Sequence, residues 1–339
     1  MIIRRRRRRR LPTAALLGAV GLLLASCASA LPLAHPDPEP AVPPPALDAK
    51  QISVVLASVG AVLEAGDANN DPAPLAARLS GPALASRTAE YLVSAKTADP
   101  SVRTELPVGS QAVIMPNTNT WPRAVAVVTK QPQNLQSPRI LTLVQDDARS
   151  PYRLWGWARL LPGTQMPRTA AAAAKGTTPL APDAPGLVLT PLDVVNQYAD
   201  VLAHGDVSAF APSFAPDVFH KQIETTLAAT STGLTQGLGA AATVTETYQP
   251  RPGELYSFST LDGGALVIAG MTTTTSLRLS GGKIEFQADV AALLGTTTVS
   301  NSATFVWSDV LVFLVPPKGS SALIQVLAAE HVRTAITGS

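Results

Sequence analysis

The chain has 339 residues, with 26 lysines and arginines, 24 aspartates and glutamates, and a single cysteine. One cysteine excludes an internal disulfide, so folding must rest on apolar burial, and the length is enough for about two domains. Seven arginines fill positions 4–10; without them 19 basic residues stand against 24 acidic ones, a net charge of −5, which argues against nucleic acid as a partner.

The N-terminal segment has the features of a bacterial lipoprotein export signal, in the right order. The arginine block is followed by the apolar stretch 11–24, and Ala25 and Ser26 lead directly to Cys27. A cationic start, a short apolar run and small residues before the cleavage site are typical of a secretory signal. We therefore expect residues 1–26 to be a signal peptide and the Cys27 thiol to carry a lipid. The predicted location is the outer face of the cell membrane, reached by either the general secretory or the twin-arginine route.

Residues 27–46 form a proline-rich segment after the cysteine. Prolines stand at positions 32, 36, 38, 40 and 43–45. This density forbids helix and sheet and favours an extended spacer. We interpret the segment as a tether, either a stalk or a disordered linker.

The first α+β domain is predicted over residues 47–166. Asp48 can cap a helix, with Gln51 three residues on as its reciprocal partner. Apolar residues then recur at helical spacing up to Gly66, which we expect to end the helix in a left-handed conformation. A shorter helical stretch contains Leu75, Leu79 and Leu84. After residue 110 the pattern changes to short β-rich runs, at 111–115, 124–129, 139–145 and 152–161.

A second domain is predicted over residues 189–339, after an Ala- and Pro-rich linker at 167–188. Thr190 can cap a helix with Pro191 in its first turn, and Gly205 closes it. The expected strands are 255–261, 265–279, 283–290, 303–315 and 323–335.

The two domains repeat one pattern. Val-Leu-Glu-Ala-Gly-Asp at 62–67 returns as Val-Leu-Ala-His-Gly-Asp at 201–206, 139 positions later. Farther along, apolar residues correspond at an offset of 135, and the pairs are Leu75 with Phe210, Leu79 with Phe214, and Leu84 with Phe219. A helix, shorter helices and an antiparallel sheet form an α+β unit in which the helix packs on one sheet face.

Tyr-Ala-Asp-Val-Leu at 198–202, then Gly205-Asp206 and Phe210 and Phe214, resembles the opening of nuclear-transport-factor-2-like domains. With the signal, the tether and the two copies, the whole chain is similar to a group of uncharacterised lipoproteins of high-GC Gram-positive bacteria. The resemblance implies two tandem cone-shaped cystatin-like domains, each with a long N-terminal helix and a short helix on a curved antiparallel sheet. Such folds host cyclases, isomerases, dehydratases and structural binding modules, so the fold does not decide the chemistry.

Enzymes of this fold place an Asp–His or Tyr–Asp set inside the cone, and the nearest candidates are Tyr198, Asp309 and His331. Asp309 interrupts the apolar run 305–313, and a buried carboxylate suits a general base. A hairpin turn at 316–321 would place Asp309 opposite Ala328 and His331 opposite Val306, about 10 Å apart. Without a bulge they form no dyad, so we predict that Asp309 faces solvent or bonds to the backbone.

Alternating residues Arg153, Trp155, Trp157 and Arg159 are candidates for a partner surface, since strand neighbours of one parity share a face. Internal packing of the tryptophans is the alternative. The spacings HxxH, HxH and HExxH are absent, and Gly237-Leu238-Gly239 lacks the strand, lysine and third glycine of a phosphate loop. We predict no metal and no cofactor.

The predicted function is a membrane-anchored extracytoplasmic lipoprotein that acts as a non-catalytic binding or scaffold module at the cell envelope. Its partners would be the membrane, through the lipid on Cys27, and an envelope protein or an apolar ligand. One alternative is a carrier of an apolar or lipid ligand in the second domain, where all seven phenylalanines lie from Phe210 onward. The other is a small-molecule enzyme of the cyclase or isomerase type.

Overall fold

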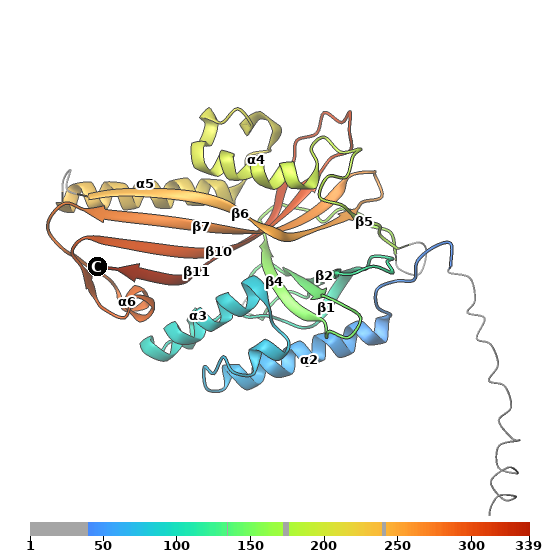
Figure 1. The fold of residues 1–339 in the computed structure, drawn as a ribbon, viewed down its shortest axis with the longest axis horizontal. Coiled ribbons are helices and arrows are strands. Elements are labelled where there is room, and N and C mark those ends of the chain that lie inside the picture. The colour runs from blue at the N-terminus through green and yellow to red at the C-terminus, as the bar shows by residue number, and fades with distance from the viewer. Residues whose placement is uncertain (1–39, 134, 172–175, 239–241) are drawn as a thin grey trace, which may run out of the picture. The chain divides into compact units, whose positions relative to one another are not determined.

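The structure, a computed structural model, describes residues 40–133, 135–171, 176–238 and 242–339. The signal peptide, Cys27 and most of the tether lie outside these residues. Val42–Ser339 group into one compact unit, which is mixed α+β and combines five α-helices with a large curled antiparallel sheet (Figure 1).

The first half begins with α2 (Ala49–Asp67), η1 (Leu75–Ala77), α3 (Gly81–Thr97) and η2 (Pro100–Val102). The predicted capping box is confirmed: the Gln51 amide donates to Asp48 Oδ1 over 2.7 Å, and the Asp48 amide donates to Gln51 Oε1 over 2.8 Å. The prediction for Gly66 is wrong. It lies inside α2, and a Cβ there would be 2.5 Å from the Tyr91 hydroxyl, so the glycine allows a close approach and does not end the helix.

Four strands follow as an antiparallel meander: β1 (Ser110–Ile114), β2 (Arg123–Thr129), β3 (Arg139–Gln145) and β4 (Arg153–Leu160). Each overlaps one of the predicted β-rich runs. The sequence supplies branched and aromatic side chains in these runs and polar turns between them, which favours strands.

The second half contains β5 (Pro179–Leu180), α4 (Pro191–His204), η3 (Gly205–Val207), η4 (Ala211–Ser213) and α5 (Val218–Leu238). Its strands are β6 (Ala242–Ser259), β7 (Ala265–Leu279), β8 (Ile284–Glu285), β9 (Thr298–Val299), β10 (Ser302–Val315) and β11 (Gln325–Gly338), with α6 (Ala288–Leu294) before β9. Thr190 caps α4 as predicted. The strand expected at 283–290 is wrong, because β8 has two residues and α6 follows it.

The strands of both halves join one nine-stranded sheet in the order β1-β2-β3-β4-β11-β10-β7-β6-β5. The halves meet where β4 pairs with β11, through Leu160 with Ala328 and Arg159 with Ala329. The segment predicted as a linker also contributes a strand to the sheet, since it contains β5, which pairs with β6. Along the sheet, the strand order of the second half mirrors that of the first.

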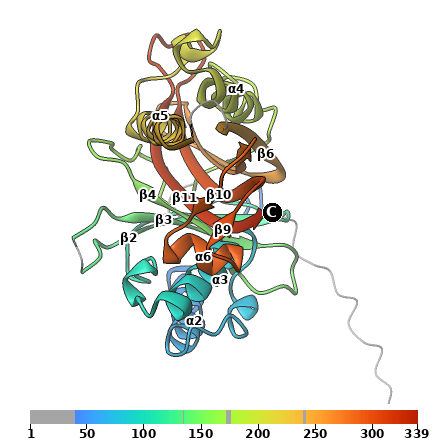
Figure 2. The same ribbon diagram turned by 90° about the vertical axis from the view of Figure 1, so that its left-hand side faces the viewer.

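Three large apolar clusters and a smaller one, around Leu277, Val299 and Ala303, lie among the described residues. One lies under α2, η1 and α3 on the first four strands, and another lies under α4 and α5 on the second half. The third joins the opposite faces of the two halves, with Ala126 and Ile140 on one side and Ile268 and Val310 on the other. The sheet therefore curls so that its halves face each other, while the long helices lie outside them (Figure 2).

The two halves repeat one local contact. Leu79 forms an isolated parallel bridge with Leu154 of β4, and Phe214 forms one with Ile324, directly before β11. Leu79 and Phe214 are paired by the offset of 135 found in the sequence. Matching backbone bonds flank both bridges: Ser80 N to Leu154 O at 2.9 Å, Leu154 N to Arg78 O at 2.7 Å, Ala215 N to Ile324 O at 2.8 Å and Ile324 N to Ser213 O at 3.0 Å.

Candidate functional site

Asp309 and His331 are direct cross-strand partners on β10 and β11. His331 Nδ1 lies 2.6 Å from Asp309 Oδ1, so the predicted separation of about 10 Å is wrong. The connection between the strands spans residues 316–324, and the pair next to it, Leu314 with Gln325, centres the hairpin at 319.5 and not near 318.5. A β-bulge between Val312 and Phe313 then shifts the register by one more residue and places Asp309 opposite His331. Asp309 is also only 1% exposed, so the expectation that it faces solvent or the backbone is wrong as well.

The Asp309 carboxylate has a second partner, because Thr273 on β7 donates its hydroxyl to Oδ2 over 2.6 Å. A carboxylate accepts hydrogen bonds and donates none. The imidazole therefore donates from Nδ1, and its neutral form carries a lone pair on Nε2. No described residue is a hydrogen-bond partner of Nε2.

The imidazole is also fixed by stacking. Its ring lies parallel to the indole of Trp307, with centroids 4.2 Å apart and an interplanar angle of 10°. Trp307 Nε1 donates to Thr275 Oγ1 over 3.0 Å, and Thr275 donates in turn to Glu246. Phe219 of α5 meets the imidazole edge-on at 6.0 Å. Three strands and a helix therefore position one histidine ring.

His331 opens to two cavities, and its side chain is 20% exposed. The larger, which we call the α5 pocket, has a volume of about 440 Å³ and is lined by residues that include Arg159, Phe219, Gln222, Ile223, Glu330 and His331. The smaller has about 280 Å³ and lies against α3 and α6. The α5 pocket combines apolar walls from α5 with polar groups from β4 and β11.

Glu330 brings a second titratable group to the α5 pocket. Burial raises its pKa from the ordinary value of 4.5 to about 7, against the opposing effect of Arg139 and Arg159. Its Oε2 is buried without a hydrogen-bond partner, although the residue as a whole is half-buried. Glu330 precedes His331 on β11, directly after the two residue pairs that join β11 to β4, and both residues line this pocket.

Tyr198 does not join this pair. It is fully buried and donates its hydroxyl to Asp217 Oδ2 over 3.0 Å. Asp217 also accepts from the backbone of His220 in the first turn of α5. Burial and the Asp217 charge raise the pKa of Tyr198, and burial raises that of Asp217. This pair links α4 to the start of α5 inside the core.

Trp155 and Trp157 are 4% and 2% exposed, and the prediction that they share a face is wrong. A β-bulge between β3 and β4 pairs Thr142 with Gly156 and Leu143 with Leu154. The extra residue is Trp155, which lies in the cluster between the two halves, whereas Trp157 lies under the helices. Only the flanking Arg153 and Arg159 reach solvent.

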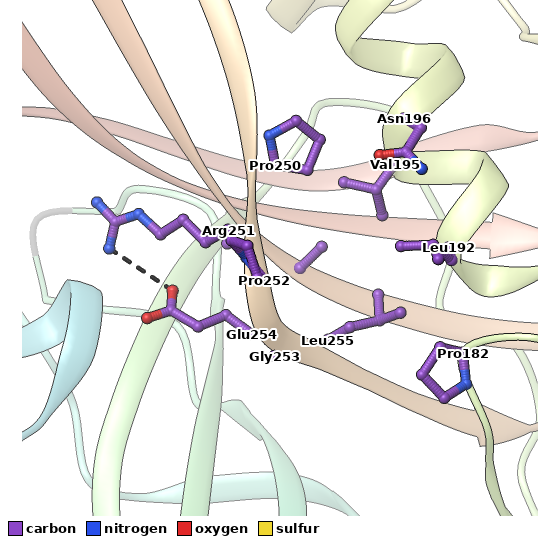
Figure 3. Close-up of a pocket in the computed structure, with 12 residues that line it drawn as sticks. Pro182, Leu192, Val195, Asn196, Pro250, Arg251, Pro252, Gly253, Glu254 and Leu255 are labelled. Carbon is purple, nitrogen blue, oxygen red and sulfur yellow. Dashed lines mark ion pairs between the residues drawn. The ribbon is translucent and has the colours of Figure 1, made fainter.

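A third cavity, of about 390 Å³, lies beside α4 and the bulged part of β6 (Figure 3). Apolar groups of Leu192, Val195 and Leu255 line it. Arg251 Nη1 and Glu254 Oε2 lie 3.6 Å apart at one side, and the two side chains extend away from α4 (Figure 3). We call this cavity the α4 pocket.

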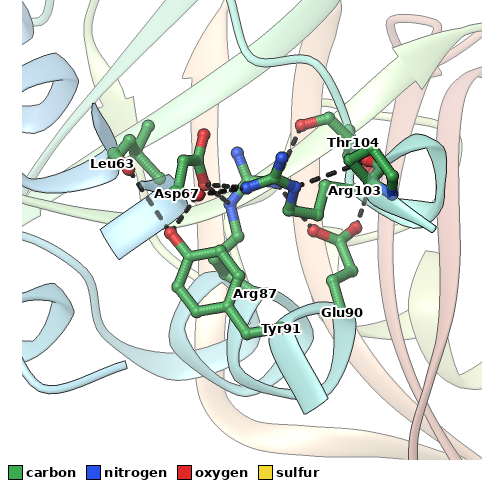
Figure 4. A network of polar contacts seen from close by, with 8 residues as sticks. Leu63, Asp67, Arg87, Glu90, Tyr91, Arg103 and Thr104 are labelled. Carbon is green, nitrogen blue, oxygen red and sulfur yellow. Dashed lines mark hydrogen bonds and ion pairs between the residues drawn. The ribbon is translucent and has the colours of Figure 1, made fainter. Parts of the chain in front are cut away.

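A buried polar network lies between α2 and α3 (Figure 4). Arg87, 2% exposed, donates to Glu90 Oε2 over 2.9 Å and to the Thr104 carbonyl over 2.9 Å. Its Nε lies 3.7 Å from Asp67 Oδ1. Burial raises the pKa of Glu90, and Arg87 opposes that shift. Every acid here has a cation beside it, so the network joins the two helices.

Glu330, Thr273 and Trp307 are parts of the site that the sequence interpretation did not select. Thr273 belongs to an unbroken threonine run at 272–275, an unusual pattern in a buried strand that could have indicated a polar face. Glu330 gave a weaker signal, because one acid beside a histidine is common in any strand.

No cluster of three or more metal-ligating side chains occurs among the described residues. Within the same part of the chain, one helix, Ala49–Asp67, is long and apolar enough to cross a membrane. Its residues Ile52, Leu56, Val59 and Leu63 are buried against the sheet.

The fold and site therefore define a mixed α+β protein with a fixed Asp–His pair at the edge of a cavity. The chain belongs to the family described as Domain of unknown function (DUF8094), whose model matches residues 43–338. Comparison with curated proteins and with solved structures gives no match.

Proposed function

We propose that the protein is a lipid-anchored extracytoplasmic lipoprotein whose folded part binds a small amphipathic molecule in the α5 pocket. The observation that supports this best is the make-up of that pocket. Phe219 and Ile223 offer an apolar wall, while Arg159, Gln222 and His331 offer donors and acceptors. Ligand sites typically combine an apolar lining with a few fixed polar groups.

The proposed architecture is a tandem of two cystatin-like domains that share one sheet. Each half has helices followed by an antiparallel meander, and the mirrored strand order fits a pseudo-two-fold relation. The paired bridges at Leu79 and Phe214 support the duplication further, because independent halves would have no reason to repeat a contact at the sequence offset.

Ligand binding is tested on the full chain purified from its own host, by native mass spectrometry and extraction of bound small molecules. Gln222 is exposed on α5, so Gln222→Trp should fill the α5 pocket without disturbing the core. We expect a small molecule to accompany the native chain and to be lost from this variant. A native chain without any bound molecule contradicts the proposal.

A carrier of an apolar ligand is the second candidate, and the α4 pocket favours it because side chains such as Leu192 and Leu255 dominate its wall. Leu192→Trp fills this cavity and is the matched control for Gln222→Trp. Loss of the ligand in Leu192→Trp, with retention in Gln222→Trp, would assign binding to the α4 pocket.

The membrane anchor is tested by Cys27→Ser. Serine keeps the size but lacks the thiol that would take the lipid. We expect the native chain to remain with the membrane fraction after a high-salt wash and the variant to be released. Equal membrane retention would contradict the lipid anchor.

A further inference from the structure

We propose that the Asp309–His331 pair is a general-base site that removes a proton from a carbon acid bound in the α5 pocket. The proposal rests on ligand binding at this same pocket. It goes further, because it assigns a chemical step to one atom, His331 Nε2.

Three observations distinguish this histidine from one that is merely buried. Nδ1 is engaged by a carboxylate that is itself 1% exposed and fixed by Thr273. The ring stacks on Trp307, which fixes its orientation. The opposite nitrogen has no partner among the described residues, and the residue lines a cavity of about 440 Å³. A carboxylate on one side and an open nitrogen on the other is how an imidazole acts as a base.

The residues that line the α5 pocket indicate the chemical class of the substrate. A small molecule with an acidic C–H beside a carbonyl would place its apolar part on Phe219 and Ile223. Nε2 forms an N–H bond as the C–H bond breaks, and the electron pair moves onto the carbonyl oxygen as an enolate. Arg159, which also lines the pocket, can donate to that oxygen. Return of the proton to another carbon completes an isomerisation with no redox change.

The same step can be measured with 5-nitrobenzisoxazole, an apolar carbon acid. Loss of its C3 proton to a base breaks the N–O bond and forms a nitrile and a coloured phenolate, with no other reactant. The full chain, in detergent, should accelerate this reaction above the detergent blank. His331→Gln should lower kcat/KM by about 100-fold or more, the usual range for removal of a general base. His204→Gln is the matched control, since His204 is exposed at the end of α4, and it should change nothing.

Asp309 is a positioning residue in this scheme, and its role needs a readout beyond the rate. In Asp309→Asn, ¹⁵N spectra of labelled histidine should show a changed tautomer at His331, because the amide can donate to Nδ1 where the carboxylate only accepted. Gln222→Trp should abolish turnover with the tautomer unchanged, which separates access to the pocket from loss of the pair.

Two results would overturn the proposal: a native chain no faster than the blank, or a folded His331→Gln variant as active as the native chain. Ligand-observed NMR of the probe distinguishes failure of the general-base proposal from failure of the proposed ligand binding. If the native chain binds the probe without converting it, and Gln222→Trp abolishes that binding, the general-base proposal is wrong and the proposed ligand binding stands. Absence of a bound ligand from the host together with absence of probe binding removes both.

Discussion

At the residue scale, the ion pairs of the structure differ in burial and therefore in how much they stabilise the fold. Arg87 is 2% exposed and bound on several sides, whereas the pair Arg153–Asp146 is partly solvated, with side chains 32% and 55% exposed. A buried ion that loses its partner is costly, while an exposed pair contributes little.

Arg87→Ala should therefore lower the free energy of unfolding by about 3–5 kcal/mol, because Glu90 would stay buried without its cation. Arg153→Ala, the matched control, should cost no more than about 1 kcal/mol. Urea unfolding of both variants measures the difference. Similar losses in the two would show that the network in Figure 4 is not a structural link between α2 and α3.

Glu330 makes stability depend on pH. The folded state keeps its proton up to a pKa of about 7, while the unfolded chain releases it near 4.5. Between these values the folded state binds more protons, so this residue's contribution to stability falls as pH rises. Glu330→Gln should be more stable relative to the native chain at pH 8 than at pH 5, by at most about 3 kcal/mol. Unfolding free energies at both pH values test this. No difference would place the carboxylate in a solvated setting, and a difference of the opposite sign would mean that Arg139 and Arg159 outweigh the effect of burial.

At the scale of elements, two helical glycines should respond in opposite directions to the same change. A Cβ at Gly66 would lie 2.5 Å from the Tyr91 hydroxyl and 2.9 Å from the Asp71 carbonyl, whereas at Gly233 in α5 nothing lies within 4 Å. Alanine is the better helix former by roughly 1 kcal/mol. Gly233→Ala should therefore stabilise by about 0.5–1 kcal/mol and Gly66→Ala should destabilise, as thermal melts would show. Stabilisation by both would mean that α2 and α3 can separate at no cost.

Local elements were predictable because their causes are local. The capping box at Asp48 and the runs that form β3 and β7 depend on neighbours in sequence, and the structure matches them. Register was not predictable. In β10 and β11 it depends on the length of the connection and on the bulge that inserts Leu327, and in β4 on the bulge that inserts Trp155. None of these leaves a pattern in the strand residues. The prediction of the candidate site was affected most, because a register error of three residues separated the Asp309 carboxylate from the His331 imidazole.

At the scale of the whole molecule, the shared apolar cluster should make the two halves unfold together. Ile268 of β7 is fully buried in that cluster, against residues of both halves. Ile268→Ala should cost about 2–5 kcal/mol, and hydrogen exchange should show the same loss of protection in β2 as in β10. Leu261→Ala, exposed in the β6–β7 turn, should change stability by less than about 0.5 kcal/mol. A loss confined to the second half would mean that the halves are energetically separate despite their common sheet.

The nine residues between β10 and β11 have an implication for other DUF8094 chains. Because side chains alternate along a strand, an insertion or deletion of odd length there would turn the histidine away from the aspartate. A chain with such a change can keep both amino acids and every strand and still lose the contact, unless a bulge restores the parity. Turn length, together with the bulge beside Leu327, is therefore a criterion for sorting family members into those able to retain the Asp–His contact and those that preserve only the scaffold.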